Sequence, residues 1–326
     1  MSVSIAFQTD KPLSAYGPLA AAAERYGFDG VSVFNDMLYQ PAWLPLLEIA
    51  RATRRVRIGP AAVNPFTCHP INIAANIALI DEASQGRAYL GFARGAWLDF
   101  VGLEPKQPVM ALREAMLAVR HLLRRSTSPL AGEIFLLAGG DALRWGAIRP
   151  DIPFLLGSWG PRMIHAGLDL IDEVKLGGTA NPAVGLWFRA QTGSAPVRLA
   201  VGAVTVVDED GVAARARARR EVALYLPVVA ELGPGLEIDP ELLAGVRAAA
   251  ASYDFETAGS FISDDLLRCI AFAGTPHEVA EQALELFAAG VDRIEFGTPH
   301  GLSEQEGVRL LGERVLPALR ANGGRI

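Results

Sequence analysis

Short β-prone runs recur along the first ninety residues at a nearly constant interval. They start near residues 3, 30, 56 and 88, so successive starts lie 27, 26 and 32 residues apart. Ala-rich or Leu-rich segments with helical character fill the spaces between them. One strand and one helix per step is the repeat of parallel strands joined by right-handed crossovers. The spacing therefore predicts an α/β fold with a parallel sheet.

Four further β-prone runs follow later in the chain, over residues 154–156, 173–176, 197–207 and 292–296. Eight strands in a βα series favour a closed barrel over an open, doubly wound sheet. We therefore predict a single (β/α)8 TIM-barrel domain over residues 1–326.

Two stretches interrupt this rhythm, approximately residues 97–150 after the fourth strand and 208–275 after the seventh. Both have helical character, and neither contains a set of strands with which to build a core of its own. Their size is typical of lids and of surfaces between subunits. We expect them to be insertions within the barrel domain.

Composition excludes several classes of function. The net charge of −6 argues against a protein that binds nucleic acid or an anionic membrane. The two cysteines, Cys68 and Cys269, have no metal-ligand spacing and form no disulfide framework. No apolar run approaches the length of a membrane span, and the first residues lack the features of a secretion signal. We expect a cytoplasmic enzyme or binding protein that acts on a small molecule.

The carboxyl ends of the predicted strands, where a barrel of this kind carries its site, are rich in glycine and weakly charged. Glycine lets backbone amides approach a ligand closely, and helix N-termini behind such loops favour an anion. Amides with one arginine and few acids suit a large anionic cofactor better than a bare metal ion. The chain has no His/Cys/carboxylate cluster of metal spacing, no serine nucleophile elbow, no Walker loop and no Gly-x-Gly-x-x-Gly after the first strand. We therefore predict no metal site and no nicotinamide-binding fold.

Three segments resemble the luciferase-like flavin and deazaflavin oxidoreductases. They are Ile-Gly-Pro-Ala-Ala-Val-Asn-Pro-Phe-Thr-Cys-His-Pro at 58–70, Ile-Asp-Glu-Ala-Ser-Gln-Gly-Arg-Ala-Tyr-Leu-Gly-Phe-Ala-Arg-Gly-Ala at 80–96, and Asp-Glu-Val-Lys-Leu-Gly-Gly-Thr-Ala-Asn-Pro at 172–182. The segments are most similar to the coenzyme F420-dependent branch, which methylenetetrahydromethanopterin reductase typifies. The resemblance runs over nearly the whole chain except residues 181–260.

The resemblance implies hydride transfer between the deazaflavin of coenzyme F420 and a small organic substrate, in a homodimer. Two alternatives stay open. One is a flavin mononucleotide (FMN)-dependent monooxygenase of the same superfamily. The other is a barrel that binds the cofactor with little turnover.

Cofactor-binding positions follow from the resemblance residue by residue. The family's third-strand bulge carries a non-prolyl cis peptide, which would fall at Ala61–Ala62. The fourth-strand loop would hold the phosphate side of the cofactor, and the loop after the sixth strand would border the substrate. The implied residues are Asn35, Ala61, Ala62, Asn64, Arg94, Gly95, Asp99, Trp159, Gly160, Arg162, Met163, Gly177, Gly178 and Thr179.

The chain departs from the family where relatives place acid/base groups. Many relatives end the second strand with Asp-His, whereas this chain reads Asn35-Asp36. Ala6 and Ala96 stand where some relatives carry glutamate. Asp36 is the titratable group left at the familiar place, and we predict that it is the catalytic acid or base.

Plainer roles compete with some of these assignments. Asp36 could only cap a helix, Asn64 could only form a turn before Pro65, and Arg94 could pair with Asp99 or Glu104 instead of a phosphate.

Overall fold

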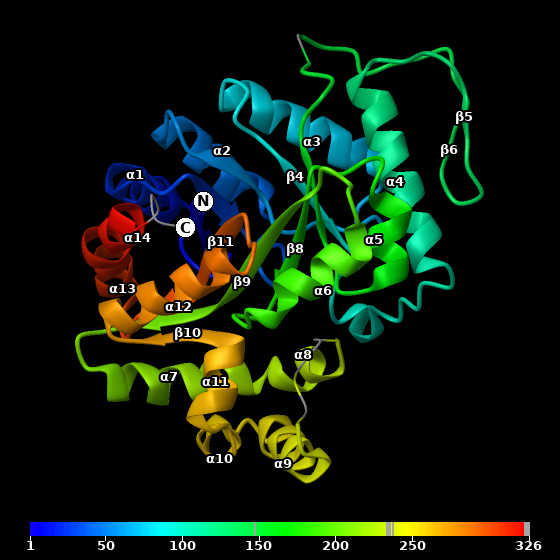
Figure 1. The fold of residues 1–326 in the computed structure, drawn as a ribbon. Coiled ribbons are helices and arrows are strands. Elements are labelled where there is room, and N and C mark those ends of the chain that lie inside the picture. Colours follow the sequence, from blue (N-terminus) through cyan, green and yellow to red (C-terminus); the bar gives the residue numbers. More distant parts are fainter. Residues whose placement is uncertain (147, 233–235, 237, 323–326) are drawn as a thin grey trace.

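The computed structural model describes residues 1–146, 148–232, 236 and 238–322 (Figure 1). The strands are β1 (Ser2–Phe7), β2 (Gly30–Val33), β3 (Arg57–Pro60), β4 (Leu90–Ala93), β5 (Leu130–Ala131), β6 (Leu136–Leu137), β7 (Phe154–Gly157), β8 (Glu173–Gly177), β9 (Arg198–Val207), β10 (Ala271–Gly274) and β11 (Arg293–His300). The helices are α1 (Tyr16–Tyr26), α2 (Trp43–Ala52), α3 (Pro70–Ala83), α4 (Pro108–Leu123), α5 (Pro161–Gly167), α6 (Ala183–Thr192), α7 (Gly211–Ala223), α8 (Leu226–Leu232), α9 (Pro240–Ala251), α10 (Phe255–Ser260), α11 (Asp264–Ile270), α12 (Pro276–Ala288), α13 (Glu304–Leu310) and α14 (Leu316–Asn322). The 3-10 helices η1 (Leu13–Ala15) and η2 (Leu98–Val101) and the π-helical segment η3 (Leu311–Val315) complete the elements.

Eight parallel strands form the barrel in the order β3-β2-β1-β11-β9-β8-β7-β4. The two ends of this path meet through isolated parallel bridges, Ile58 with Ala88 and Val63 with Phe92. Helices surround the strands in Figure 1. The prediction of a (β/α)8 barrel is therefore confirmed, and all eight barrel strands overlap the β-prone runs of the sequence.

Along each barrel strand, side chains that face the surrounding helices alternate with side chains that face the barrel interior. In β8, Val174 and Leu176 belong to the apolar core between strands and helices, whereas Glu173 and Lys175 alternate with them. The same holds in β11, where Ile294 and Phe296 are core residues. Because successive side chains point to opposite faces of a strand, the alternating residues face the barrel interior.

The second insertion has an apolar cluster of its own, built by helices. The cluster takes small and branched residues from α7, α9, α10, α11 and β10, among them Ala214, Ala218, Val222, Val246, Ala258, Leu267 and Ile270. Strand β10, which the sequence pattern does not reveal, pairs with the far end of β9. In Figure 1 these helices lie together beside the barrel, below β9 and β10. The insertion is thus a compact unit attached through one strand.

The first insertion adds a β-hairpin to the barrel. Strands β5 and β6 pair antiparallel, and the hairpin extends away from the barrel in Figure 1. The carboxylate of Glu114 on α4 accepts hydrogen bonds from the backbone N–H groups of Glu133, Ile134 and Phe135 at 2.8–3.0 Å. This carboxylate fixes the hairpin to the helix that follows β4.

Closure of the barrel between β3 and β4 requires glycine at Gly91. A methyl group there would overlap the backbone carbonyl oxygen of Pro60. We expect Gly91→Ala to destabilise the fold by about 3 kcal/mol, because backbone atoms cannot move aside as a flexible side chain can. Gly157→Ala is the matched control, since its methyl group would lie 3.5 Å from Ala93 Cβ, an ordinary contact. Urea unfolding midpoints measure both, and an unchanged midpoint for Gly91→Ala would contradict the expectation.

Candidate active site at the barrel mouth

A buried layer of charged and polar groups crosses the barrel interior. Arg293 on β11 donates to Glu173 Oε2 at 2.8 Å and to Glu295 Oε2 at 2.8 Å. Lys175 on β8 and Ser32 on β2 also donate to Glu295. The Ser32 hydroxyl lies 2.6 Å from the Tyr89 hydroxyl. Residues from β2, β8 and β11 therefore meet around one carboxylate.

The pKa values of this layer follow from burial and from the neighbouring charges. Burial opposes ionisation of Glu295, but Lys175 and Arg293 outweigh it and lower the pKa of Glu295 to about 2. Burial alone would lower the pKa of Arg293. The carboxylates of Glu173 and Glu295 outweigh this effect and raise the pKa of Arg293. Burial and the charge of Glu295 raise the pKa of the Tyr89 hydroxyl. At neutral pH the layer thus holds an ionised carboxylate, a guanidinium and a neutral phenol.

Above this layer, towards the carboxyl ends of the strands, the inward positions carry small residues. They are Ala6, Ala61, Ala93, Gly157, Gly177 and Gly297, with Phe34 the large exception. A methyl group placed on Gly177 would have nothing within 4 Å. Small side chains above a polar floor leave room for a planar ligand at this end of the barrel, which we call the mouth.

Asp36, the predicted catalytic residue, lies at the mouth on the loop after β2. Its side chain is half-buried, and its Oδ2 accepts a hydrogen bond from Gln8 Nε2 at 2.8 Å. Partial burial and the nearby carboxylate of Asp36 raise the pKa of Tyr225 to about 12. Tyr225, between α7 and α8, is therefore a protonated hydroxyl near Asp36 at neutral pH. Neighbouring Asn35 accepts from the backbone N–H of Ala42 at 3.0 Å, which fixes the loop to the start of α2.

The loop after β3 contains the cis peptide that the family resemblance implies, at Ala61–Ala62. Asn64 is buried, and its Oδ1 accepts from the backbone N–H groups of Phe66 and Thr67 at 3.0 and 2.9 Å. Its turn-forming role, one of the two alternatives, is therefore present. A Cβ atom on Gly95 would lie 2.8 Å from Asn64 Nδ2, so the loops after β3 and β4 pack directly against each other.

Arg94 and Asp99 follow β4, and both side chains are exposed. Within the residues that the structure describes, Arg94 forms no ion pair, with Asp99, Glu104 or any other acid. A guanidinium free of carboxylates at a barrel mouth is available to an anionic ligand.

The loop after β7 carries Trp159, whose indole N–H donates to the Gly177 carbonyl oxygen at 2.9 Å. Its ring lies 5.8 Å from that of Trp187 on α6. Gly160 caps α5, on which Arg162 is exposed and Met163 is buried. The polar atom of Trp159 thus holds the strand ends together, and its ring remains half-buried at the mouth.

The loop after β8 is fixed from two sides. Gly178 has a φ of +75° and donates its N–H to the Gly202 carbonyl oxygen at 2.7 Å. Thr179 is buried and donates its hydroxyl to the Cys269 carbonyl oxygen at 3.3 Å, at the end of α11. A Cβ on Gly178 would lie 2.5 Å from Val229 of α8. The second insertion therefore covers this corner of the mouth.

Sequence reasoning missed Gln8, Tyr225 and the buried charged layer. A pattern for the layer was present, because Glu-Val-Lys-Leu at 173–176 and Arg-Ile-Glu-Phe at 293–296 both alternate charged with apolar residues. When helices cover the outside of a barrel, the charged residues of such strands must face inward. The position of Tyr225 depends on how the insertion folds back, which no short-range pattern reveals.

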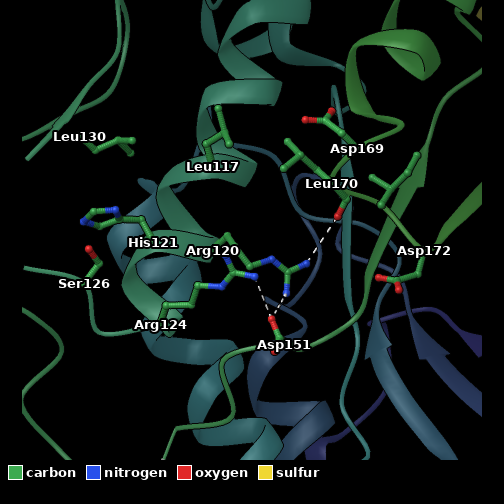
Figure 2. Close-up of a pocket in the computed structure, with 11 residues that line it drawn as sticks. Leu117, Arg120, His121, Arg124, Ser126, Leu130, Asp151, Asp169, Leu170 and Asp172 are labelled. Carbon is green, nitrogen blue, oxygen red and sulfur yellow. Dashed lines mark hydrogen bonds and ion pairs between the residues drawn. The ribbon is translucent and has the colours of Figure 1, made fainter. Parts of the chain in front are cut away.

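A cavity of about 590 Å³ lies elsewhere, between α4 and the loops that precede β7 and β8 (Figure 2). Arg120 donates to the carbonyl oxygen of Ile152 at 3.0 Å, and its guanidinium lies 3.9 Å from the ring centroid of Phe154. Arg124 pairs with Asp151 at 3.1 Å. Because Asp151 and Asp172 precede their strands, this cavity is at the end of the barrel opposite the mouth. Its arginines are engaged in holding the fold.

Two absences apply to the described part of the chain. No group of three or more His, Cys, Asp or Glu side chains is arranged to hold a metal ion there. Nor does any helix in it have the length and apolar content needed to cross a membrane.

Comparisons with known proteins place the chain in a family. The model of the luciferase-like monooxygenase family matches residues 3–293. The chain is 26% identical to a 5,10-methylenetetrahydromethanopterin reductase of Methanolobus tindarius, over 97% of this chain and 100% of the relative. It is 28% identical to the enzyme of that name from Archaeoglobus fulgidus, over 91% and 93%.

A solved structure is also closely similar. The coenzyme F420-dependent tetrahydromethanopterin reductase of Methanopyrus kandleri superposes with a TM-score of 0.88 at 25% identity, over 98% of this chain and 99% of that one. The resemblance inferred from the three sequence segments is thus confirmed. The chain belongs to the luciferase-like monooxygenase family.

Proposed function

We propose that this chain is a cytoplasmic, coenzyme F420-dependent oxidoreductase that transfers a hydride between the deazaflavin and a small organic substrate. The observation that carries the proposal is full-length similarity to 5,10-methylenetetrahydromethanopterin reductases and to the structure of the coenzyme F420-dependent tetrahydromethanopterin reductase of Methanopyrus kandleri. Both cysteines are free thiols, as is usual for a protein of a reducing compartment.

The residues at the mouth fit such a cofactor. Small inward side chains and open space beside Gly177 leave room for a planar ring. The guanidinium of Arg94, which forms no ion pair with any residue that the structure describes, supplies positive charge for an anionic tail. When bound, coenzyme F420 supplies a ring that accepts or releases a hydride. The protein orients that ring between the loops after β3 and β8 and excludes water from it.

The implied contacts fall into two kinds. Four of the predicted residues form a hydrogen bond to the backbone through a side-chain atom, namely Asn35, Asn64, Trp159 and Thr179. We assign these four to shaping the loops, and only their remaining side-chain atoms to contact with the cofactor. Direct contact is assigned to the other predicted residues, whose side chains form no hydrogen bond or ion pair within the part of the chain that the structure describes. These are the backbone at Ala61, Ala62, Gly95, Gly160, Gly177 and Gly178, and the side chains of Arg94, Asp99, Arg162 and Met163.

Titration of the purified protein with coenzyme F420 and with FMN tests the proposal. We expect saturable F420 binding that is tighter than FMN binding. Arg94→Ser should weaken F420 binding by about tenfold or more, because a hydrogen bond to a charged group is lost. Arg124→Ser, on α4 at the opposite end of the barrel, is the control and should bind like the wild type. Preference for FMN would favour the monooxygenase alternative instead.

Asp36 is the proposed acid or base at the substrate side. Asp36→Asn keeps an oxygen that can accept from Gln8 but removes the ionisable proton. We expect turnover to fall by about 10²- to 10⁴-fold, with F420 affinity changed less than threefold. The assay follows F420 absorbance with a panel of acceptors that includes 5,10-methylenetetrahydromethanopterin. Equal turnover in variant and wild type would remove Asp36 from the mechanism, and tight binding without turnover in the wild type would favour the low-turnover alternative.

We infer a homodimer from large apolar side chains that are exposed on α2, on α3 and after β4. Leu44 on α2 is 59% exposed, Leu79 on α3 is 50% exposed, and Phe100 after β4 is 66% exposed. Packed helices with exposed leucines are typical of surfaces that a second subunit covers. Light scattering should give twice the chain mass, and Leu79→Glu should shift it towards the monomer. A wild-type protein of single-chain mass would reject the dimer.

A further inference from the structure

One ammonium group lies directly beneath the mouth. Lys175 contacts Glu295, and its Nζ lies 5.2 Å from the ring centroid of Phe34, the residue that follows β2 at the mouth. Its side chain crosses in front of Gly202 on β9, where a Cβ atom would lie 2.9 Å from Lys175 Cε. Glycine at 202 therefore provides the space in which the lysine extends across the barrel.

Glu295 has both of its carboxylate oxygens hydrogen-bonded, whereas Lys175 uses only part of its donor capacity. Glu295 accepts from Lys175, Ser32 and Arg293, so both of its oxygens are engaged. An ammonium group has three N–H donors, and Glu295 is the one hydrogen-bond partner of Lys175 among the described residues. Glu295 itself is 1% exposed, whereas Lys175 is 8% exposed. The carboxylate thus holds the ammonium in place and leaves two donors for another group.

Stability alone gives a weak reason for this arrangement. TIM-barrel interiors are usually filled by branched apolar side chains. A buried ion pair often stabilises a fold no better than apolar residues of the same volume, because both charges lose their hydration. Arg293 is shared between Glu173 and Glu295, at 2.8 Å from each carboxylate, so Lys175 supplies the second positive charge for two carboxylates. Charge balance does not require that the two remaining N–H donors of this ammonium lack a partner among the described residues, and these donors, on the side towards the mouth, point to a ligand.

We propose that Lys175 is a catalytic residue that donates a hydrogen bond to the bound deazaflavin ring at the floor of the mouth and stabilises its reduced form. This inference rests on the proposed function. A hydride carries two electrons and one proton, so the group that accepts it gains one unit of negative charge and the donor loses one. Positive charge held at the floor favours the state in which the ring has gained that charge. Glu295 acts as the positioning residue that holds the ammonium in place.

The test compares affinities for oxidised and reduced coenzyme F420, measured separately by anaerobic fluorescence titration. We expect Lys175→Met to weaken binding of the reduced form at least tenfold and of the oxidised form less than threefold. Lys175→Arg keeps the charge and should restore at least part of the difference. In Lys175→Met, Glu295 keeps Arg293 and Ser32 as partners, so we expect the fold to survive, which thermal melting checks.

Gly202→Ala is the second variant. Its methyl group displaces the flexible end of Lys175 without removing the charge. We expect the same selective loss for the reduced form, with a melting temperature close to that of the wild type. If Lys175→Met and Gly202→Ala, both folded, bind the two forms in the wild-type ratio, the assignment of Lys175 is wrong. If the wild-type protein binds neither form, the proposed function fails instead.

Discussion

The ionised carboxylate of Glu295 is the centre on which the barrel interior depends. Its charge would be costly to bury alone, and it persists because Arg293 and Lys175 lie on neighbouring inward positions. Ser32 satisfies a further lone pair. Strands β2, β8 and β11 are thereby held around the carboxylate of Glu295. Because this layer fills the lower half of the interior, the space between the small residues above it can stay open without collapse of the barrel.

Barrel architecture was predictable from spacing because each strand–helix step is a local pattern that repeats. The same reasoning located the loops of the mouth, since the site of a barrel lies at the carboxyl ends of its strands. The side-chain roles were less accessible. Asn64 and Thr179 were predicted as ligand contacts, and the structure shows that each also satisfies backbone groups of a loop. Polar side chains in tight turns often form hydrogen bonds to nearby backbone groups, because a buried N–H or C=O without a partner destabilises the fold.

Residues brought in from distant segments were the hardest to foresee. Tyr225 belongs to the second insertion, whose helices bury their own apolar cluster and attach to the barrel through β10 and β9. Nothing in a short window indicates that the turn between α7 and α8 returns to Asp36. Lys175 was within reach, since its strand alternates charged and apolar residues. The family resemblance instead implied contacts at residues 177–179, in the loop that follows the same strand.

The ionisable groups around the mouth differ in burial and in their partners, and these differences suit them to different roles. Lys175 is buried and tied to a carboxylate, so its charge is fixed in position and little screened by solvent. Arg94 is exposed and has no acid beside it in the described chain, so its guanidinium is available to an anionic ligand. The hydroxyl of Tyr225, with its raised pKa, can donate a hydrogen bond at neutral pH but cannot act as a base. Near the mouth, Gln8 orients the carboxylate of Asp36, and Asp36 is therefore the residue to which we assign the proposed acid or base role.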